Sequence, residues 1–168
     1  MTKNIVLIGL MGCGKTTVGK LLAEKAEMKL VDTDALIVEK AGKSINNIFA
    51  EDGEPVFRDI EASVIKDVSE KENLVVSTGG GAVVREENID NLKKNGVLFY
   101  LYAPAEKLYE RIKGDNERPL IKTESPLATL QTLLKNREMF YMQADYKINT
   151  VNKTPDEITE EIIKLFAY

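Results

Sequence analysis

The sequence predicts an α/β domain in which helices flank a central five-stranded parallel sheet. Short apolar, β-branched runs alternate along the chain with longer amphipathic stretches, which is the pattern of repeated strand and helix units. Several of the short runs are continuously apolar, as expected of strands covered by helices on both faces. The 168 residues suit one hydrophobic core, and no internal repeat or linker divides them. We therefore expect residues 1–168 to form a single domain.

The five strands are predicted from these short apolar runs, each of which is followed by a polar or glycine-containing segment. In chain order they are expected at Asn4 to Ile8, Met28 to Val31, Leu74 to Ser77, Val97 to Tyr102 and Tyr146 to Asn149.

Helices are predicted in the longer amphipathic stretches between the strands. The last helix has a clear start signal, because Thr154 is a good N-cap, Pro155 suits the first helical position, and acidic residues follow in the first turn. The helices are expected at Lys15 to Ala26, Asp34 to Ala41, Ile45 to Glu51, Pro55 to Glu70, Glu86 to Lys94, Ala105 to Arg111, Pro126 to Ala144 and Pro155 to Phe166.

Composition excludes several classes of protein. A net charge of −4 argues against general binding to nucleic acid, which requires a clustered basic surface. No run of apolar residues is long enough to span a membrane, and no basic and apolar leader precedes the first strand. The only cysteine, Cys13, fits a reducing compartment. We expect a cytoplasmic monomer that binds neither nucleic acid nor membrane.

The segment from Gly9 to Thr16, "GLMGCGKT", matches the pattern G-x-x-x-x-G-K-[ST] between a predicted strand and a predicted helix. Its glycines allow backbone N–H groups to surround a β-phosphate, Lys15 reaches the β and γ oxygens, and Thr16 offers a hydroxyl to Mg²⁺. Cys13 is expected to be a small side chain filling a variable position of this loop, and a redox role is the other possibility. The sequence therefore predicts a nucleoside triphosphate site.

Two common classes of protein with this loop do not fit. The guanine-recognition pattern N-K-x-D is not met, because Asp156 lies one residue too far from Asn152 and Lys153. A motor would require an acidic residue at the end of an apolar strand, whereas Leu74 to Val76 leads into Ser77 and three glycines. Of the three classes compared, a switch, a motor and a small-molecule kinase, the kinase remains.

Two further strand ends carry candidate chemistry. Asp32 and Asp34 follow the second strand, so one could hold Mg²⁺ through water while the other accepts a proton from an alcohol; alternatively, Asp32 or Thr33 caps the next helix. The glycines at 79–81 follow the third strand, where a backbone without side chains can donate N–H groups to a ligand or can form a plain flexible loop.

Four of the five arginines lie where they could meet an anionic substrate, although each alone could be a surface residue. Glu61 is three residues after Arg58 and could hold its guanidinium across a helical turn. The polar segment Lys113 to Ser125 is longer than an ordinary connection and is predicted to be a mobile insertion. The four arginines are Arg58, Arg111, Arg118 and Arg137.

Taken in order, these motifs resemble the shikimate kinase family of P-loop kinases, which is related to the nucleoside-monophosphate kinases. The resemblance covers essentially the whole chain. It rests on Gly9 to Thr16, "DTD" at 32–34, "GEPVFRDIE" at 53–61, "TGGG" at 78–81, "RPL" at 118–120 and Arg137. It implies the P-loop NTPase fold with a substrate-binding helical region at about 33–61 and a mobile lid at about 112–125.

The resemblance also implies a reaction and its residues. ATP, with Mg²⁺, would phosphorylate the 3-hydroxyl of shikimate in the pathway to chorismate and the aromatic amino acids. Lys15, Asp34 and Arg118 would be catalytic, with Arg118 reaching the transferring phosphate. Shikimate would be bound by Asp34, Arg58, Gly79, Gly80, Gly81 and Arg137. The nucleotide would be bound by Gly12, Cys13, Gly14, Lys15, Thr16, Thr17, Arg111, Arg118, Lys153 and Pro155, and the metal by Thr16 and Asp32.

Departures from the family pattern are small. Lys153 stands where many members have arginine, and Ser77 replaces a commoner small apolar residue. Two alternatives remain: a kinase of another small acceptor, such as gluconate or a nucleoside monophosphate, and a binding module that holds nucleotide without transferring phosphate.

Overall fold

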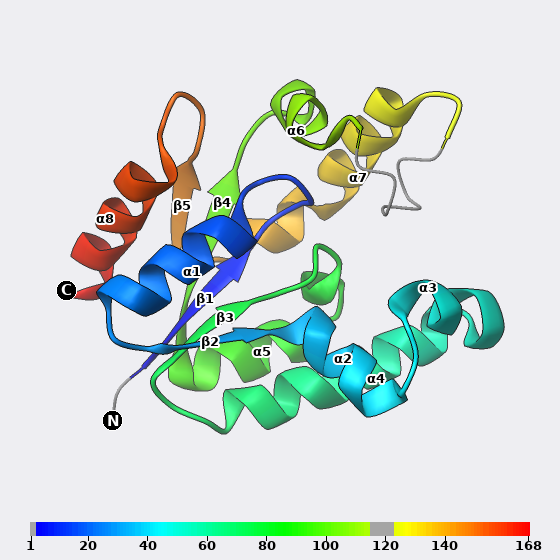
Figure 1. Cartoon of the computed structure of the whole chain (residues 1–168), viewed down its shortest axis with the longest axis horizontal. Coiled ribbons are helices and arrows are strands. Elements are labelled where there is room, and N and C mark those ends of the chain that lie inside the picture. The colour runs from blue at the N-terminus through cyan, green and yellow to red at the C-terminus, as the bar shows by residue number, and fades with distance from the viewer. Residues whose placement is uncertain (1–2, 115–122) are drawn as a thin grey trace.

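The computed structural model describes residues 3–114 and 123–168. Its centre is a five-stranded parallel sheet with the strand order β2-β3-β1-β4-β5 (Figure 1). The strands are β1 (Asn4–Ile8), β2 (Lys29–Asp32), β3 (Leu74–Ser77), β4 (Gly96–Tyr102) and β5 (Tyr146–Asn149). The predicted three-layer α/β fold is confirmed.

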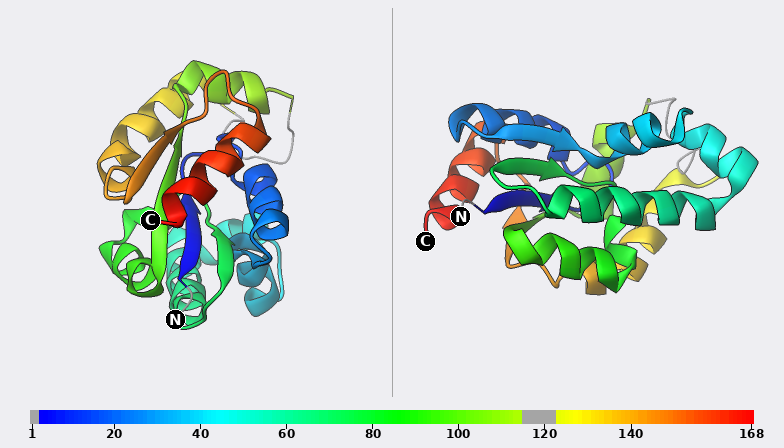
Figure 2. Two further views of the ribbon diagram at one scale, coloured as in Figure 1. Left: turned by 90° about the vertical axis from the view of Figure 1, so that its left-hand side faces the viewer. Right: turned by 90° about the horizontal axis from the view of Figure 1, so that it is seen from below.

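Helices cover both faces of this sheet. Helices α1 and α8 pack together on one face, and α5 and α7 lie on the other (Figure 2). The α-helices are α1 (Lys15–Lys25), α2 (Thr33–Ala41), α3 (Ile45–Asn47), α4 (Glu54–Ser69), α5 (Glu86–Asn95), α6 (Ala105–Ile112), α7 (Pro126–Tyr141) and α8 (Pro155–Phe166). A π-helical turn, η1 (Ile48–Asp52), and a 3₁₀ turn, η2 (Ala82–Val84), complete the described elements.

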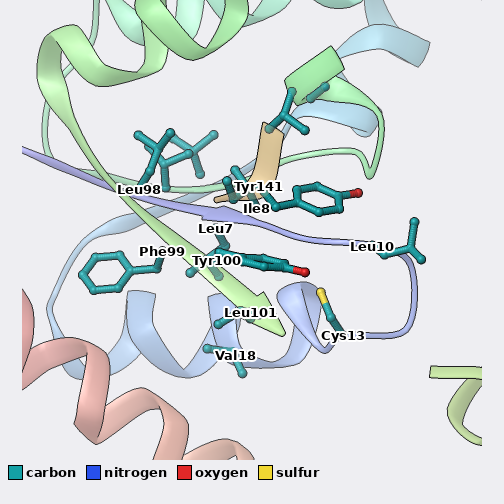
Figure 3. Close-up of a cluster of buried hydrophobic side chains, with 14 of the residues drawn as sticks. Leu7, Ile8, Leu10, Cys13, Val18, Leu98, Phe99, Tyr100, Leu101 and Tyr141 are labelled. Carbon is teal, nitrogen blue, oxygen red and sulfur yellow. The ribbon is translucent and has the colours of Figure 1, made fainter. Parts of the chain in front are cut away.

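The core lies on both sides of the central strands. All five residues of β1 are buried, and Leu7, Phe99 and Tyr100 contribute to the cluster drawn in Figure 3. Burial on both faces explains why β1, β3 and β4 are apolar along most of their length rather than alternating. No helix in the described part of the chain is both long and apolar enough to cross a membrane.

The register brings three strand ends together at one edge of the sheet. Asp32 at the end of β2 pairs with Ser77 of β3, which in turn pairs with Leu7 of β1. The segments that follow these strands therefore start side by side, as ligand-binding loops do in open parallel sheets.

The structure departs from the predicted elements at a few boundaries. The segment predicted as one helix from Ile45 to Glu51 is a single α-helical turn, α3, followed by η1. The N–H of Gly53 donates to the Ile48 carbonyl across five residues at 3.0 Å, and Gly53 has a positive φ of 85°, so this segment widens before α4 begins.

Helix α7 ends at Tyr141 rather than Ala144. Ala144 donates to the Tyr141 carbonyl at 3.1 Å, three residues back, so the last turn tightens as the chain bends toward β5. Asp145 then anchors to β4, because its N–H donates to the Leu98 carbonyl and its carboxylate accepts from the Leu98 N–H.

Candidate active site

The loop between β1 and α1 forms one wall of a cleft of about 380 Å³ at the carboxyl edge of the sheet. Gly14 is the N-cap of α1 and has a left-handed φ of 99°, a conformation that side chains other than glycine rarely adopt. The cleft is lined by Met11, Gly12, Gly14, Lys15, Thr16, Thr17, Asp32, Asp34, Ser77, Thr78, Gly79, Gly80, Arg111 and Ile112. A helix N-terminus and a lysine facing one cleft make an anion-binding arrangement.

The Lys15 ammonium lies over this loop. Its Nζ donates to the Gly9 carbonyl at 2.6 Å, to the Leu10 carbonyl at 3.3 Å and to Cys13 Sγ at 3.4 Å. Cys13 itself is buried against the core and is labelled beside Tyr100 in Figure 3. A phosphate in the cleft would offer Lys15 an acceptor of opposite charge in place of neutral carbonyls.

Asp32 and Asp34 have different environments because helix α2 starts between them. Asp32 is the N-cap: its Oδ1 accepts from the N–H groups of Asp34 at 2.9 Å and of Ala35 at 3.4 Å. Of the two caps considered from the sequence, Asp32 rather than Thr33 therefore has this role. The buried Thr33 hydroxyl accepts instead from the Gly79 N–H at 3.3 Å, which ties the glycine loop to α2.

Asp34 lies against the glycine loop. A Cβ placed on Gly79 would come within 2.8 Å of Asp34 Oδ1 and 3.4 Å of Glu61 Oε2. Both carboxylates therefore approach the loop at a point where no side chain intervenes.

Arg58 is held by two carboxylates from its own helix. Its Nη1 donates to Glu61 Oε1 at 2.8 Å, and its Nη2 donates to Glu54 Oε1 at 3.4 Å. The Arg58 side chain is 13% exposed and that of Glu61 only 1%. A Cβ on Gly81 would lie 2.6 Å from Arg58 Nη1, so only glycine permits this close approach. The i,i+3 spacing of Arg58 and Glu61 supports the interaction expected from the sequence.

Burial raises the pKa of Glu61 above its ordinary value of 4.5; the Arg58 guanidinium opposes this change, and the charge of Asp34 adds to it. Ionised Glu61 therefore destabilises the folded chain relative to the unfolded one. This destabilisation is absent below the ordinary pKa and complete above the raised pKa.

We expect a pH-dependent difference in stability when Glu61 is replaced by glutamine, which does not titrate. The Tm of Glu61→Gln minus that of the wild type should become more positive as pH rises from the ordinary carboxyl pKa of 4.5 toward neutral pH. Thermal denaturation of both proteins across this range measures the difference. A difference that falls as pH rises would mean that Arg58 outweighs burial and lowers the pKa of Glu61.

A second cavity, of about 160 Å³, adjoins the cleft on the side of α3, η1 and α4. Met11, Asp34, Gly79 and Gly80 line both spaces. The other lining residues are Ile45, Phe49, Phe57, Arg58, Glu61, Gly81 and Arg137. Two guanidinium groups, two carboxylates and a glycine backbone therefore surround one small space with an apolar wall. Such a space suits a hydroxylated carboxylic acid.

A third cavity, of about 210 Å³, adjoins the cleft on the opposite side, where Gly14, Thr17 and Arg111 line both. Arg111 Nη1 donates to the Thr150 hydroxyl at 3.2 Å and to the Gly12 carbonyl at 3.3 Å. Arg111 therefore links the loop between β1 and α1 to the loop between β5 and α8. Lys153 Nζ contacts Glu161 Oε2 at 2.6 Å. The remaining lining residues are Cys13, Val18, Thr150, Lys153, Pro155 and Ile158.

Oxygen ligands for a hard cation are present in the cleft. Thr16, in the first turn of α1, and Asp32, at the end of β2, line the same space. The described residues contain no group of three or more His, Cys, Asp and Glu side chains that could hold a metal ion. Mg²⁺ commonly uses one or two protein ligands together with substrate phosphates and water, so this donor set fits it.

The three adjoining spaces together contain every site residue predicted from the sequence except Arg118, which lies outside the described residues. Sequence reasoning did not assign a site role to Ile45, Phe49 or Thr33. Phe49 lies in the π-helical turn and its ring is 4.6 Å from that of Phe57, a contact that no spacing rule predicts. Thr33 directly follows β2, as the glycine loop follows the neighbouring β3, and this shared position at the carboxyl edge of the sheet was the available signal for their contact.

Comparisons with known proteins agree on one family. The family model described as shikimate kinase matches residues 11–167. A shikimate kinase of Caldicellulosiruptor bescii is 48% identical over 163 residues, which are 97% of this chain and 95% of that protein. A shikimate kinase of Thermodesulfovibrio yellowstonii is 47% identical over 96% of this chain and 94% of its own length.

Solved structures give the same result. The structure of shikimate kinase from Acinetobacter baumannii in complex with shikimate has a TM-score of 0.94 and 38% identity, covering 99% of this chain and 94% of that one. A gluconokinase from Sinorhizobium meliloti has a TM-score of 0.67, 22% identity and coverage of 98% and 91%, which shows a shared fold alone.

Proposed function

Because the chain belongs to the shikimate kinase family and transfers a phosphoryl group from ATP to shikimate, we propose that the acceptor binds in the cavity between Asp34, Arg58 and Arg137. The observation that carries this proposal is that Arg58, Arg137 and the carboxylate of Asp34 converge on a space that adjoins the larger cleft. An acceptor bound there has its ring hydroxyls next to the position of a nucleotide γ-phosphate.

Arg58 and Arg137 bind the shikimate carboxylate in this proposal. Guanidinium groups form short, paired hydrogen bonds with carboxylates, and these bonds are stronger where water is excluded. Glu61 and Glu54 hold Arg58 in place through its Nη1 and Nη2 groups. The backbone at Gly79, Gly80 and Gly81 lines the same cavity, as does Asp34, and these groups bind the ring hydroxyls.

Asp34 is the group that accepts the proton of the attacking 3-hydroxyl. It lines both the cleft and the acceptor cavity, so it lies beside the path between donor and acceptor. A carboxylate next to an alcohol both orients the oxygen for in-line attack and removes its proton as the bond to phosphorus forms.

Lys15, with the loop backbone around Gly12, Cys13 and Gly14, binds the phosphates of ATP. Arg111, Thr17, Lys153 and Pro155 bind the nucleoside end, since they line or flank the third cavity. Arg118 contacts the transferring phosphoryl group, an assignment that rests on the resemblance alone. We also propose a single domain with an acceptor-binding region at about 33–61 and a lid at about 112–125.

Thr16 and Asp32 are the residues proposed to hold Mg²⁺. Thr16 offers its hydroxyl, and Asp32 can accept from a metal-bound water because both of its capping bonds use Oδ1. Mg²⁺, when bound, neutralises charge on the β and γ phosphates. The proposal extends to a cytoplasmic monomer.

Release of ADP in a coupled assay tests the function. We expect release to depend on shikimate and to be much slower with gluconate or a nucleoside monophosphate as acceptor. Equal release with and without shikimate would favour a binding module, and faster turnover of another acceptor would replace shikimate in the proposal.

The carboxylate clamp is tested by replacing Arg137 with alanine. Loss of one partner from a desolvated charge pair should lower kcat/KM for shikimate by roughly 30-fold or more, with little change in nucleotide affinity. Steady-state kinetics in shikimate and titration with ATP measure the two quantities.

Arg85→Ala is the matched control for this variant. Arg85 lies just after η2 but outside the acceptor cavity, and its Nη1 pairs with Asp59 Oδ1 at 2.8 Å on the surface. It should leave both quantities unchanged. An Arg137→Ala enzyme with normal shikimate kinetics would remove Arg137 from the clamp.

A further inference from the structure

Tyr141, the last residue of α7, lies behind the wall of the acceptor cavity. It is fully buried and does not line the cavity. Its hydroxyl donates to the Gly80 carbonyl at 2.5 Å. Because Tyr141 follows Arg137 by four residues, the two side chains lie on the same face of the helix. One helix turn therefore presents a guanidinium to the cavity and a phenol to the backbone behind it.

The hydrogen bond from Tyr141 orients a peptide group that faces the acceptor. In a trans peptide the carbonyl of one residue and the N–H of the next point in opposite directions, and no described peptide bond is cis. Holding the Gly80 carbonyl on the Tyr141 side therefore also sets the direction of the Gly81 N–H. Gly81 is the residue against which Arg58 packs.

Gly80 lies between Arg137 and the loop that joins β1 to α1. A Cβ at Gly80 would be 3.5 Å from Arg137 Nη1 and 3.6 Å from both the Gly9 carbonyl oxygen and the Met11 nitrogen. A shift of this peptide would therefore change the shape of the acceptor cavity, which Gly80 and Arg137 both line.

The phenol is uncharged at physiological pH. Burial raises the pKa of Tyr141, and the charge of Arg137 only partly opposes that rise. Tyr141 therefore keeps the proton that it donates to the Gly80 carbonyl.

The tyrosine itself has little freedom to move. Its ring stacks on that of Tyr100, with centroids 4.9 Å apart and an angle of 22° between the planes. Figure 3 shows the two rings lying together in the buried cluster beside β1. A buried, stacked ring is a rigid support for groups that must be placed accurately.

We infer that Tyr141 is a positioning residue for the acceptor site: its hydroxyl holds the Gly80–Gly81 peptide, which lies beside the guanidinium groups of Arg137 and Arg58, in the arrangement that shikimate requires. This inference rests on the proposed binding of shikimate in the cavity formed by Asp34, Arg58 and Arg137. Tyr141 acts through these groups and does not itself touch the acceptor.

Tyr141→Phe tests the inference, because it removes one oxygen and keeps the ring. The KM for shikimate should rise roughly tenfold, the effect of losing one buried hydrogen bond, while kcat at saturating shikimate and the KM for ATP change by less than about threefold. Steady-state kinetics in each substrate measure these values, and thermal denaturation shows whether the variant folds.

Tyr100→Phe is the matched control. Tyr100 is 1% exposed, stacks on the same ring, and donates its own hydroxyl to Glu138 Oε2 at 2.8 Å instead of to the glycine loop. It should lower the Tm by an amount similar to Tyr141→Phe but leave the KM for shikimate unchanged. An equal rise in KM in both variants, or a parallel rise in the KM for ATP, would overturn the inference.

A second variant tests whether the hydrogen bond donated by the Tyr141 hydroxyl is responsible for the effect. Replacing Tyr141 by 4-aminophenylalanine returns an N–H at the position of the hydroxyl, and the KM for shikimate should return to within about threefold of the wild-type value. A KM that stays raised would overturn the role of the donor. Shikimate-dependent ADP release by the wild type distinguishes failure of the proposed function from failure of the inference about Tyr141. If the wild type shows no such release, the proposed function is wrong. If the wild type shows it and Tyr141→Phe has normal kinetics, only the positioning role of Tyr141 is wrong.

Discussion

Replacing Asp34 by asparagine should lower kcat for shikimate phosphorylation by roughly 10²- to 10⁴-fold, the range found when a general base is removed. The substitution preserves the size of the side chain and its ability to hydrogen-bond a ring hydroxyl. It removes only the negative charge that accepts the proton. The KM for shikimate should therefore change much less than kcat.

The position of Asp34 supports a large effect on kcat and a small effect on the KM for shikimate. Its carboxylate lies against Gly79 and lines both the phosphate cleft and the acceptor cavity. Asparagine can keep the acceptor in the cavity, but it cannot take a proton at neutral pH. Pre-steady-state measurement of phosphoryl transfer, with both substrates saturating, would report the chemical step directly.

Asp59→Asn is the matched control, since Asp59 lies on the surface and pairs only with Arg85 among the ion pairs of the described residues. It should leave kcat unchanged. If Asp34→Asn retained kcat to within about threefold, Asp34 would be a binding residue and another group would accept the proton.

Replacing Lys15 by methionine should lower kcat by roughly 10²- to 10³-fold, the effect of removing one preorganised donor from a site where charge develops. Methionine retains an unbranched stem and loses the ammonium. Affinity for ATP should fall as well, because the same ammonium binds the ground-state phosphates.

The Lys15→Met variant must also be checked for correct folding. Lys15 Nζ also donates to the Gly9 and Leu10 carbonyls, so its loss removes bonds within the loop. Thermal denaturation should show a folded protein, because Val18 and Leu22 still anchor α1 in the core.

Lys20→Met is the control, since Lys20 lies on the exposed side of the same helix. It should not alter kcat or affinity for ATP. Normal phosphoryl transfer by Lys15→Met would show that the loop backbone alone supplies the stabilisation attributed to the lysine.

The elements were predicted well where the local pattern and the tertiary structure impose the same requirement. Strands β1, β3 and β5 begin and end where predicted. Helix α8 also matches in full, because its capping box at Thr154 and Glu157 is formed by residues close in sequence. Prediction failed at Ile45 to Glu51, where the structure has a π-helical turn in which the ring of Phe49 packs on that of Phe57 in the next helix.

The grouping of the candidate residues around one cleft was predictable to a similar degree. Lys15, Thr16, Asp34 and the glycine run were recognisable because each lies in a short motif with a chemical reason for its spacing. Tyr141 was not, since nothing near it in sequence indicates that its hydroxyl meets the Gly80 carbonyl, 61 residues away along the chain. Such contacts depend on the packing of α7 against the sheet.

By itself, then, the sequence determined the class of fold, the phosphate loop, and the chemical types of group available for an anionic, hydroxylated acceptor. These features follow from hydrophobic periodicity and from motifs whose residues are neighbours in the chain. Only the tertiary structure decided which groups share a cavity, which of the two aspartates caps a helix, and what holds the glycine loop from behind. The reason is physical: the register between β1, β2 and β3, and the packing of Tyr141 of α7 on Tyr100 of β4, set distances between residues that no local preference controls.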